Sequence, residues 1–251
     1  MGLFKNNKKL CPVCGSPTPR LFATSVEKMP LCKECARKVD LPEGVLDTMS
    51  LEDFKQYLSF YDGNQRLREM FSETNRYTFS LLSGSLLVDA AHGLFRLRED
   101  DNALVLEADN LKSFRILEDT KPLYESGERA LKCYPSDVPG RVGEMAAKLS
   151  NIALKRLILD QIRDKEDMQA SYRDNVDTDQ LTPFRHFYVE LSFDHPYWKE
   201  FKSKRSAPTF DPNNPSADVY MEAYQQEVDK LHALAKSLMQ MICADAQETM
   251  G

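Results

Sequence analysis

Two Cys-x-x-Cys pairs near the N-terminus constrain this chain more than any other feature. They occupy Cys11–Cys14 and Cys32–Cys35. Two thiolates separated by two residues in a tight turn can both reach one ion at about 2.3 Å, and two such turns at this separation are typical of a structural zinc site. The spacing therefore predicts one structural Zn²⁺. Its four predicted ligands are Cys11, Cys14, Cys32 and Cys35.

The residues next to each pair fit a small zinc-binding fold. Gly15 follows the first pair and can adopt positive φ, which turns backbone amides back towards the sulfurs. The segment Ala36–Val39 follows the second pair and is predicted to form a first helical turn, whose N-terminus favours thiolate charge. A knuckle, a hairpin and a helix together predict a treble-clef-like or ribbon-like finger over residues 1–45.

Such pairs could also form disulfides or a redox-active dithiol. A thioredoxin-type site needs a single Cys-x-x-Cys motif in a βαβ context, whereas this chain has two pairs in register. The sequence shows no secretory segment that would place the chain in an oxidising compartment. Both arguments favour zinc. The isolated Cys133 and Cys243 are expected to be free thiols.

Composition bounds the rest of the chain. With 251 residues, 42% hydrophobic and 29% charged, the chain can bury one sizeable core plus a small satellite domain. No apolar run approaches the roughly 20 residues that span a bilayer. The sequence therefore predicts a cytoplasmic protein with no membrane partner.

Charge is divided unevenly, because the finger is basic whereas the chain as a whole has a net charge of -6. Four thiolates around one divalent ion leave about two negative charges, which the excess lysines could simply balance. The same excess could instead neutralise nucleic-acid phosphates. Both interpretations stay open. The basic residues of the finger are Lys5, Lys8, Lys9, Arg20, Lys28, Lys33, Arg37 and Lys38.

The remaining sequence alternates between helical and strand patterns. Ser50 is an N-cap signal for a helix that ends near Tyr61, and a second helical turn follows near Leu67–Phe71, so residues 46–74 form a predicted helical linker. From Thr78 the hydrophobic period changes to two, which predicts an antiparallel meander. Its expected strands are 85–88 and 94–98 as a hairpin, 103–107, 110–117 and, as a candidate, 129–134.

The C-terminal half adds two helices and one further strand. Helical spacing of apolar residues predicts a helical insertion over about 140–165, and strict alternation predicts a strand over 184–193. Ser216 caps a long amphipathic helix, over about 216–246, that is expected to cover the sheet. The polar stretch 164–180 lacks the glycine and closing Glu of a calcium loop, so Asp174, Asp177 and Asp179 are expected to lie in a solvated loop. The fold class is therefore α+β, with a β-rich domain over 75–251.

Four segments together resemble a family of proteins. They are the finger segments Cys11–Gly15 and Leu31–Cys35, the hairpin Leu87–Arg96, and Ala108–Asp119. In them the chain resembles an uncharacterised bacterial family, the domain of unknown function numbered 4428, best over the first 120 residues. The resemblance implies a four-cysteine zinc finger followed by a pleckstrin-homology-like β domain, and it implies no activity. It departs at Met29-Pro30, where the family often has Asp-Gly, and at the helical insertion.

Function is predicted mainly from missing catalytic motifs. The sequence has no nucleophile elbow, no His-Glu-x-x-His, no Walker loop and no dinucleotide fingerprint, and its four histidines are scattered. We therefore expect a non-enzymatic module that binds another protein, with nucleic-acid binding through the basic finger as the alternative. Lipid binding is disfavoured, because the hairpin turn 89–93 carries no Lys or Arg. The histidines are His92, His186, His195 and His232.

Overall fold

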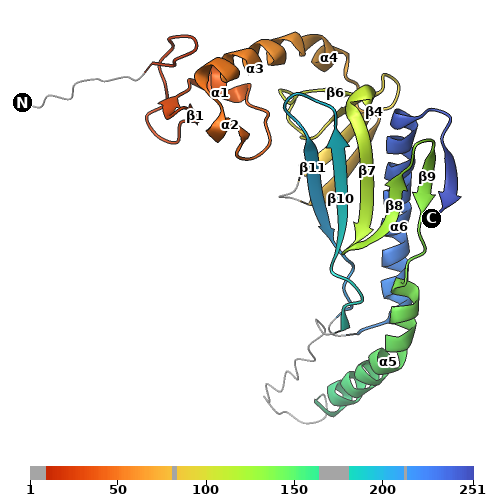
Figure 1. Cartoon of the computed structure of the whole chain (residues 1–251). Coiled ribbons are helices and arrows are strands. Elements are labelled where there is room, and N and C mark those ends of the chain that lie inside the picture. Colours follow the sequence, from red (N-terminus) through yellow and green to blue (C-terminus); the bar gives the residue numbers. More distant parts are fainter. Residues whose placement is uncertain (1–9, 81–83, 164–180, 212–213) are drawn as a thin grey trace, which may run out of the picture. The chain divides into compact units, whose positions relative to one another are not determined.

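The computed structural model describes residues 10–80, 84–163, 181–211 and 214–251 (Figure 1). Contacts within the chain group these residues into two compact units, each of which is described by itself. The first unit comprises Met1–Lys112 and Ser192–Phe201, and the second comprises Ser113–Leu191 and Lys202–Gly251. The sequence predicted a different division, into a finger over residues 1–45, a helical linker over 46–74 and a β-rich domain over 75–251. That division stays a prediction. No helix in the described ranges is both long and apolar enough to cross a membrane.

The first unit begins with the finger and a run of helices. A two-stranded hairpin joins the two cysteine pairs, and a short helix follows the second pair. The strands are β1 (Ser25–Val26) and β2 (Met29–Pro30), and the helices are α1 (Lys33–Arg37), α2 (Val45–Thr48), α3 (Leu51–Gly63) and α4 (Gln65–Met70). The predicted helices after the finger are therefore confirmed.

Helix α3 begins where the sequence predicted. Ser50 accepts a hydrogen bond from the Asp53 amide at 3.1 Å, and Asp53 accepts one from the Ser50 amide at 3.3 Å. This reciprocal capping box satisfies two backbone donors that would otherwise lack partners. The buried face of the helix follows helical spacing and comprises Phe54, Tyr57, Leu58 and Tyr61.

Asp40 connects the finger to the rest of the first unit. Its carboxylate accepts a hydrogen bond from the Leu104 amide at 2.7 Å and pairs with Arg98 Nε at 3.3 Å. The Tyr57 hydroxyl accepts a hydrogen bond from the Asp40 amide at 2.8 Å, and Trp198 Nε1 donates to the Asp40 carbonyl at 3.1 Å. All of these residues except Arg98 are buried, so their mutual hydrogen bonds fix the chain at the point where it leaves the finger.

A four-stranded antiparallel sheet completes the first unit, in the order β3-β4-β5-β6. The predicted hairpin is confirmed, because β4 pairs with β5 around the turn after Asp89. The predicted strand at 103–107 shortens to two residues. Leu104 and Val105 give their amides to the side chains of Asp40 and Asn64 rather than to a neighbouring strand. The strands are β3 (Asn75–Ser80), β4 (Gly84–Asp89), β5 (Leu94–Arg96) and β6 (Leu106–Glu107).

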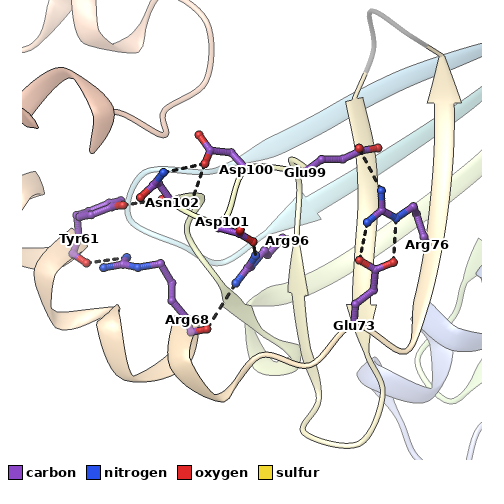
Figure 2. A network of polar contacts seen from close by, with 9 residues as sticks. All are labelled: Tyr61, Arg68, Glu73, Arg76, Arg96, Glu99, Asp100, Asp101 and Asn102. Atoms are coloured by element: carbon purple, nitrogen blue, oxygen red, sulfur yellow. Dashed lines mark hydrogen bonds and ion pairs between the residues drawn. The ribbon is translucent and has the colours of Figure 1, made fainter. Parts of the chain in front are cut away.

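Figure 2 shows how polar contacts join α3 and α4 to the loop after β5. The Arg68 guanidinium lies 4.0 Å from the Tyr61 ring centroid and donates to the Tyr61 carbonyl at 2.9 Å. The Tyr61 hydroxyl donates to the Asn102 carbonyl at 2.6 Å. Arg96 is buried and pairs with Asp101 at 3.2 Å. These contacts tie the two helices to the loop, so the network has the form of a structural support, although the buried Arg96 Nε has no hydrogen-bond partner among the described residues.

A second group in Figure 2 lies on the surface of the small sheet. Arg76 pairs with Glu73 at 2.7 Å and with Glu99 at 3.1 Å. Exposed ion pairs of this kind stabilise a protein little, because water and salt screen the two charges. This group therefore adds little to the stability of the first unit.

The second unit carries a six-stranded sheet in the order β11-β10-β7-β8-β9-β12. Strand β8 pairs antiparallel with β7 and with β9, whereas β12 lies parallel to β9 at the edge. A 3-10 turn, η1 (Ala108–Asn110), precedes β7. The strands are β7 (Leu111–Glu118), β8 (Lys121–Ser126), β9 (Ala130–Cys133), β10 (His186–Phe193), β11 (Glu200–Ser206) and β12 (Gln247–Met250).

Strand β10 confirms the clearest strand prediction. Every second side chain of the strand is buried and those between are half-buried, as strict alternation requires. The buried residues are Phe187, Val189, Leu191 and Phe193.

Helix α6 (Ala217–Ile242) begins at the predicted Ser216 cap and contacts β8 and β9 (Figure 1). Its buried stripe includes Tyr220, Tyr224, Leu231 and Leu238, which confirms that an apolar face of the helix is covered.

Helix α5 (Val138–Arg163) confirms the helical insertion but begins earlier than its apolar spacing predicted. Only part of the expected apolar stripe is covered, because Leu149 is 1% exposed and Leu157 is 58% exposed. The polar stretch 164–180, with Asp174, Asp177 and Asp179, lies outside the described residues. The α+β class with antiparallel sheets is confirmed.

Candidate metal centre

The four predicted cysteine ligands come together in the finger. Their Sγ atoms all lie within 4.8 Å of one another. The Sγ of Cys14 lies 3.4 Å from that of Cys32 and 3.8 Å from that of Cys35. Sulfurs at the corners of a tetrahedron, each about 2.3 Å from one ion, are about 3.8 Å apart. The four cysteines are therefore positioned to hold one metal ion.

The first pair is shaped by a tight turn. The Gly15 amide donates to the Cys11 carbonyl at 2.9 Å, and the Cys11 amide donates to the Ser16 carbonyl at 2.8 Å. Gly15 has φ of 71°, the left-handed conformation that the sequence predicted. The turn brings both sulfurs of the pair to the same side of the chain.

The second pair lies where helix α1 begins. Cys32 is the N-cap residue, and its Sγ accepts a hydrogen bond from the Cys35 amide at 3.4 Å. The preceding hairpin turns through Glu27 and Lys28, whose φ angles are both positive. The Leu31 amide then donates to the Thr24 carbonyl at 2.8 Å, which holds the base of the hairpin. The predicted order of knuckle, hairpin and helix is thus present, but the helix begins at Lys33, inside the second pair, rather than at Ala36 as predicted, because Cys32 itself caps it.

The four thiols differ in their surroundings. Cys11, Cys32 and Cys35 are buried and Cys14 is exposed. Hydrogen bonds from the side chain and amide of Ser16 lower the pKa of Cys14 to about 6, whereas burial raises the pKa of Cys35 well above its ordinary value. A divalent cation is the group that would favour the thiolate form at all four sulfurs together. All six cysteines of the chain are free thiols, so no disulfide competes for these sulfurs.

Several basic residues of the finger have acidic partners close by. Lys38 Nζ lies 2.6 Å from the Asp62 carboxylate, and Arg37 lies 3.5 Å from that of Glu34. Lys5, Lys8 and Lys9 lie outside the described residues. In the described part of the finger, the positive charges of Lys38 and Arg37 are therefore partly neutralised by neighbouring carboxylates.

Two of the histidines have clear structural roles. Asp89 holds the His92 ring at 2.8 Å, and the buried His195 accepts a hydrogen bond from the Trp198 amide at 3.0 Å. Burial also lowers the pKa of His195 to about 4, so its ring is neutral at physiological pH. These contacts orient loops around the two rings.

A second group of metal-ligating side chains was missed by sequence reasoning. Cys133, His232 and Glu248 have ligand atoms within 4.8 Å of one another. The sequence pattern presents Cys133 as an isolated thiol, because the three residues are far apart in the chain and follow no motif spacing. The pairing of the C-terminal strand with β9, together with the packing of α6 on the sheet, brings them together.

Comparisons with known proteins were made for the whole chain. A scan against protein-family models and searches of curated proteins and of solved structures find no match. The interpretation of the two cysteine pairs therefore depends on donor chemistry and geometry alone.

Proposed function

We propose that the chain is a non-enzymatic interaction module that binds one structural Zn²⁺ through the finger and recognises another protein. The convergence of the Cys11, Cys14, Cys32 and Cys35 sulfurs is the observation that carries this proposal. Four thiolates in a tetrahedron favour zinc over hard cations, which prefer oxygen ligands. A site closed by four protein ligands has no open position for a substrate, so its role is structural.

The loop between the cysteine pairs supplies a surface for a partner. Leu21 is 76% exposed and Phe22 is 102% exposed, and the two are neighbours in sequence. Phe22 also has φ of 54°, a conformation that is uncommon for an aromatic residue and costs of order 1 kcal/mol. Adjacent exposed apolar side chains, one of them on a strained backbone, are typical of a recognition loop.

The finer fold assignments belong to the same proposal. The sequence of knuckle, hairpin and short helix supports a treble-clef-like finger, and antiparallel strands followed by an amphipathic helix support a pleckstrin-homology-like β domain. We assign the chain to the bacterial family numbered 4428 on the same grounds. Six free thiols support a reducing, cytoplasmic setting.

Nucleic-acid binding through the basic finger is the weaker candidate. Counterion release requires cations that are free to meet phosphates. Lys38 and Arg37 already lie beside carboxylates, which reduces the positive field of the finger. Exposed Leu21 and Phe22 fit an apolar protein surface better than a phosphate backbone.

The proposal is tested by zinc content and by site-specific photo-crosslinking in cells. Protein purified without chelator should hold zinc, and Cys14→Ser should lose the zinc of the finger. A photoreactive residue at Phe22 should capture a distinct partner, whereas the same residue at Val219, which is 64% exposed on α6, should not. Identical captured proteins at both positions would count against the recognition loop, and protein without zinc would count against the metal.

A further inference from the structure

Three metal-ligating side chains meet at one edge of the second unit. Cys133 is the last residue of β9, His232 lies on α6, and Glu248 lies on β12. A sulfur, an imidazole nitrogen and a carboxylate oxygen all lie within 4.8 Å of one another. This donor set is independent of the finger, because no residue of the finger belongs to it.

The backbone around the cluster explains how distant residues meet. Helix α6 ends at Ile242, and the Ala246 amide then donates to the Cys243 carbonyl at 3.1 Å, which turns the chain back towards the sheet. Strand β12 pairs parallel with β9, and the Gly251 amide donates to the Cys133 carbonyl at 2.9 Å. The pairing places Glu248 one strand away from Cys133 and beside α6.

His232 is held in a ligand-like orientation. Its ring stacks on Tyr124 with centroids 5.2 Å apart and an interplanar angle of 18°. Tyr124 is the register partner of Cys133 across β8 and β9, so the stacked imidazole lies over the same part of the sheet as the thiol. Stacking fixes the ring plane without using either ring nitrogen.

The buried Nε2 atom of His232 is the most telling detail. It makes no hydrogen bond within the part of the chain that the structure describes, although it lies 3.4 Å from Glu248 Oε1. Ligand atoms about 2.0–2.1 Å from one tetrahedral ion are about 3.3–3.4 Å apart. The separation of the two atoms therefore matches the edge of a coordination tetrahedron better than a hydrogen bond.

Lys236 shows that Glu248 also takes part in an ordinary ion pair. Its Nζ lies 2.8 Å from Glu248 Oε1, and both side chains are about half exposed. A surface ion pair accounts for the position of Glu248, but it does not account for the approach of the Cys133 sulfur and the unbonded His232 nitrogen. Lys236 Nζ and His232 Nε2 both approach the same oxygen, Glu248 Oε1. A carboxylate oxygen carries two lone pairs, so Oε1 can serve an ammonium group and a metal together.

We propose that Cys133, His232 and Glu248 form a second metal site, which takes Zn²⁺ or a similar borderline divalent transition metal. Thiolate and imidazole ligands exclude Mg²⁺ and Ca²⁺ as the preferred ion. Three protein ligands leave a fourth position for water or an exchangeable donor, unlike the closed finger. A bound ion would fasten β12 to α6 and β9, so occupancy of the site would control the C-terminal strand.

Equilibrium zinc titration of the full chain tests the second site. With the finger loaded first, wild-type protein should bind one additional zinc ion, for two per chain in total. Cys133→Ser should bind only the finger zinc. Glu248→Gln should weaken the second site by about tenfold or more, since it removes a ligand. Cys243→Ser, which changes a half-buried cysteine outside the cluster, should still bind two.

A failure of the second metal site can be told apart from a failure of the proposed zinc site in the finger. Cys14→Ser should lose the tight zinc and keep the second site, as judged by the remaining metal and by its sensitivity to Glu248→Gln. Glu248 is exposed, so its substitution should leave the circular dichroism spectrum unchanged and separate lost binding from lost fold. A single zinc ion in wild type, or a second zinc ion unaffected by both Cys133→Ser and Glu248→Gln, would overturn the proposal.

Discussion

The finger and the Cys133 cluster gather metal-ligating atoms in opposite ways. The finger brings four sulfurs together with two short turns and one hairpin, all within Cys11–Cys35. The cluster needs a strand, a long helix and the C-terminal strand, which meet only after the second unit has folded. A site built from local turns can depend on its ion for folding, whereas a site built on a packed sheet is carried by a core that exists without it.

The largest expected effect is the unfolding of the finger when it loses its metal, while the second unit stays folded. Cys14→Ala removes one of four ligands, and structural zinc contributes on the order of 10 kcal/mol to the folding of such small elements. Residues 1–40 should therefore unfold while the second unit stays intact. Hydrogen exchange should show lost protection at finger amides such as that of Leu31 and unchanged protection in the second unit, with Cys243→Ala as the control. Protected finger amides in zinc-free Cys14→Ala would contradict the dependence on metal.

The second unit should instead depend on apolar burial. Leu231 is 6% exposed on the buried face of α6. Leu231→Asp places a charge without a partner in an apolar contact, and it should lower the free energy of unfolding by several kcal/mol. Val219→Asp changes an exposed residue of the same helix and should have little effect. Thermal unfolding followed by circular dichroism measures both, and equal melting temperatures would show that α6 packs elsewhere.

The difference between features built from neighbouring residues and features built by tertiary pairing also explains which elements the sequence alone could predict. Local signals were sufficient for the finger, for the Ser50 and Ser216 caps and for β10, because each depends on residues adjacent in the chain. Strand β12 has no buried side chain, and β11 buries only Ser203, so neither carries an apolar alternation. Each of these strands forms by pairing with an outer strand of the rest of the sheet. A local sequence pattern does not encode such pairing.

The same limit applies to the sites. Spacing alone predicts the four finger cysteines as ligands, because a turn fixes the distance between two thiols. Tertiary pairing decides whether Cys133 has ligand-type neighbours, so its sequence context gave no signal. The short length of β6 has a related cause. The Leu104 and Val105 amides donate to the side chains of Asp40 and Asn64, so they are not available to pair with a neighbouring strand.

Two buried acids, Asp89 in the first unit and Glu118 in the second, should contribute to stability with opposite dependence on pH. In the first unit, burial favours the neutral form of Asp89, but hydrogen bonds from Ser72 and His92 outweigh it and lower the pKa of Asp89. Its stabilisation is present above the unfolded pKa and is lost as pH falls through the folded value. In the second unit, burial raises the pKa of Glu118 despite hydrogen bonds from Tyr224 and Ser136. The contribution of Glu118 is greatest below the unfolded pKa and falls as pH rises through the folded value.

Paired substitutions measure these two responses. Between wild type and Asp89→Asn, the difference in melting temperature of the first unit should shrink as the solution is acidified. Between wild type and Glu118→Gln, the wild type should lose stability relative to the variant as pH rises from about 4 to 7. Melting curves at several pH values, with the exposed Asp109→Asn or Glu107→Gln as controls, provide the measurement. Differences that do not vary with pH would show that neither carboxyl changes its proton affinity on folding.

The smallest expected effect concerns the contrast in charge between the basic finger and the acidic chain as a whole. If the finger lysines mainly balance thiolate charge, duplex or single-stranded nucleic acid should bind no better than non-specific contacts, with Kd in the high micromolar range at physiological salt. Changing Lys5, Lys8, Lys9 or Lys38 to Glu should then alter fluorescence anisotropy very little. Lys38→Glu serves as an internal check, because it also breaks the ion pair with Asp62 and should lower stability slightly. A submicromolar complex that weakens steeply with salt, and by a similar factor for each lysine, would instead make nucleic acid the partner of the finger, because counterion release scales with the number of phosphates neutralised.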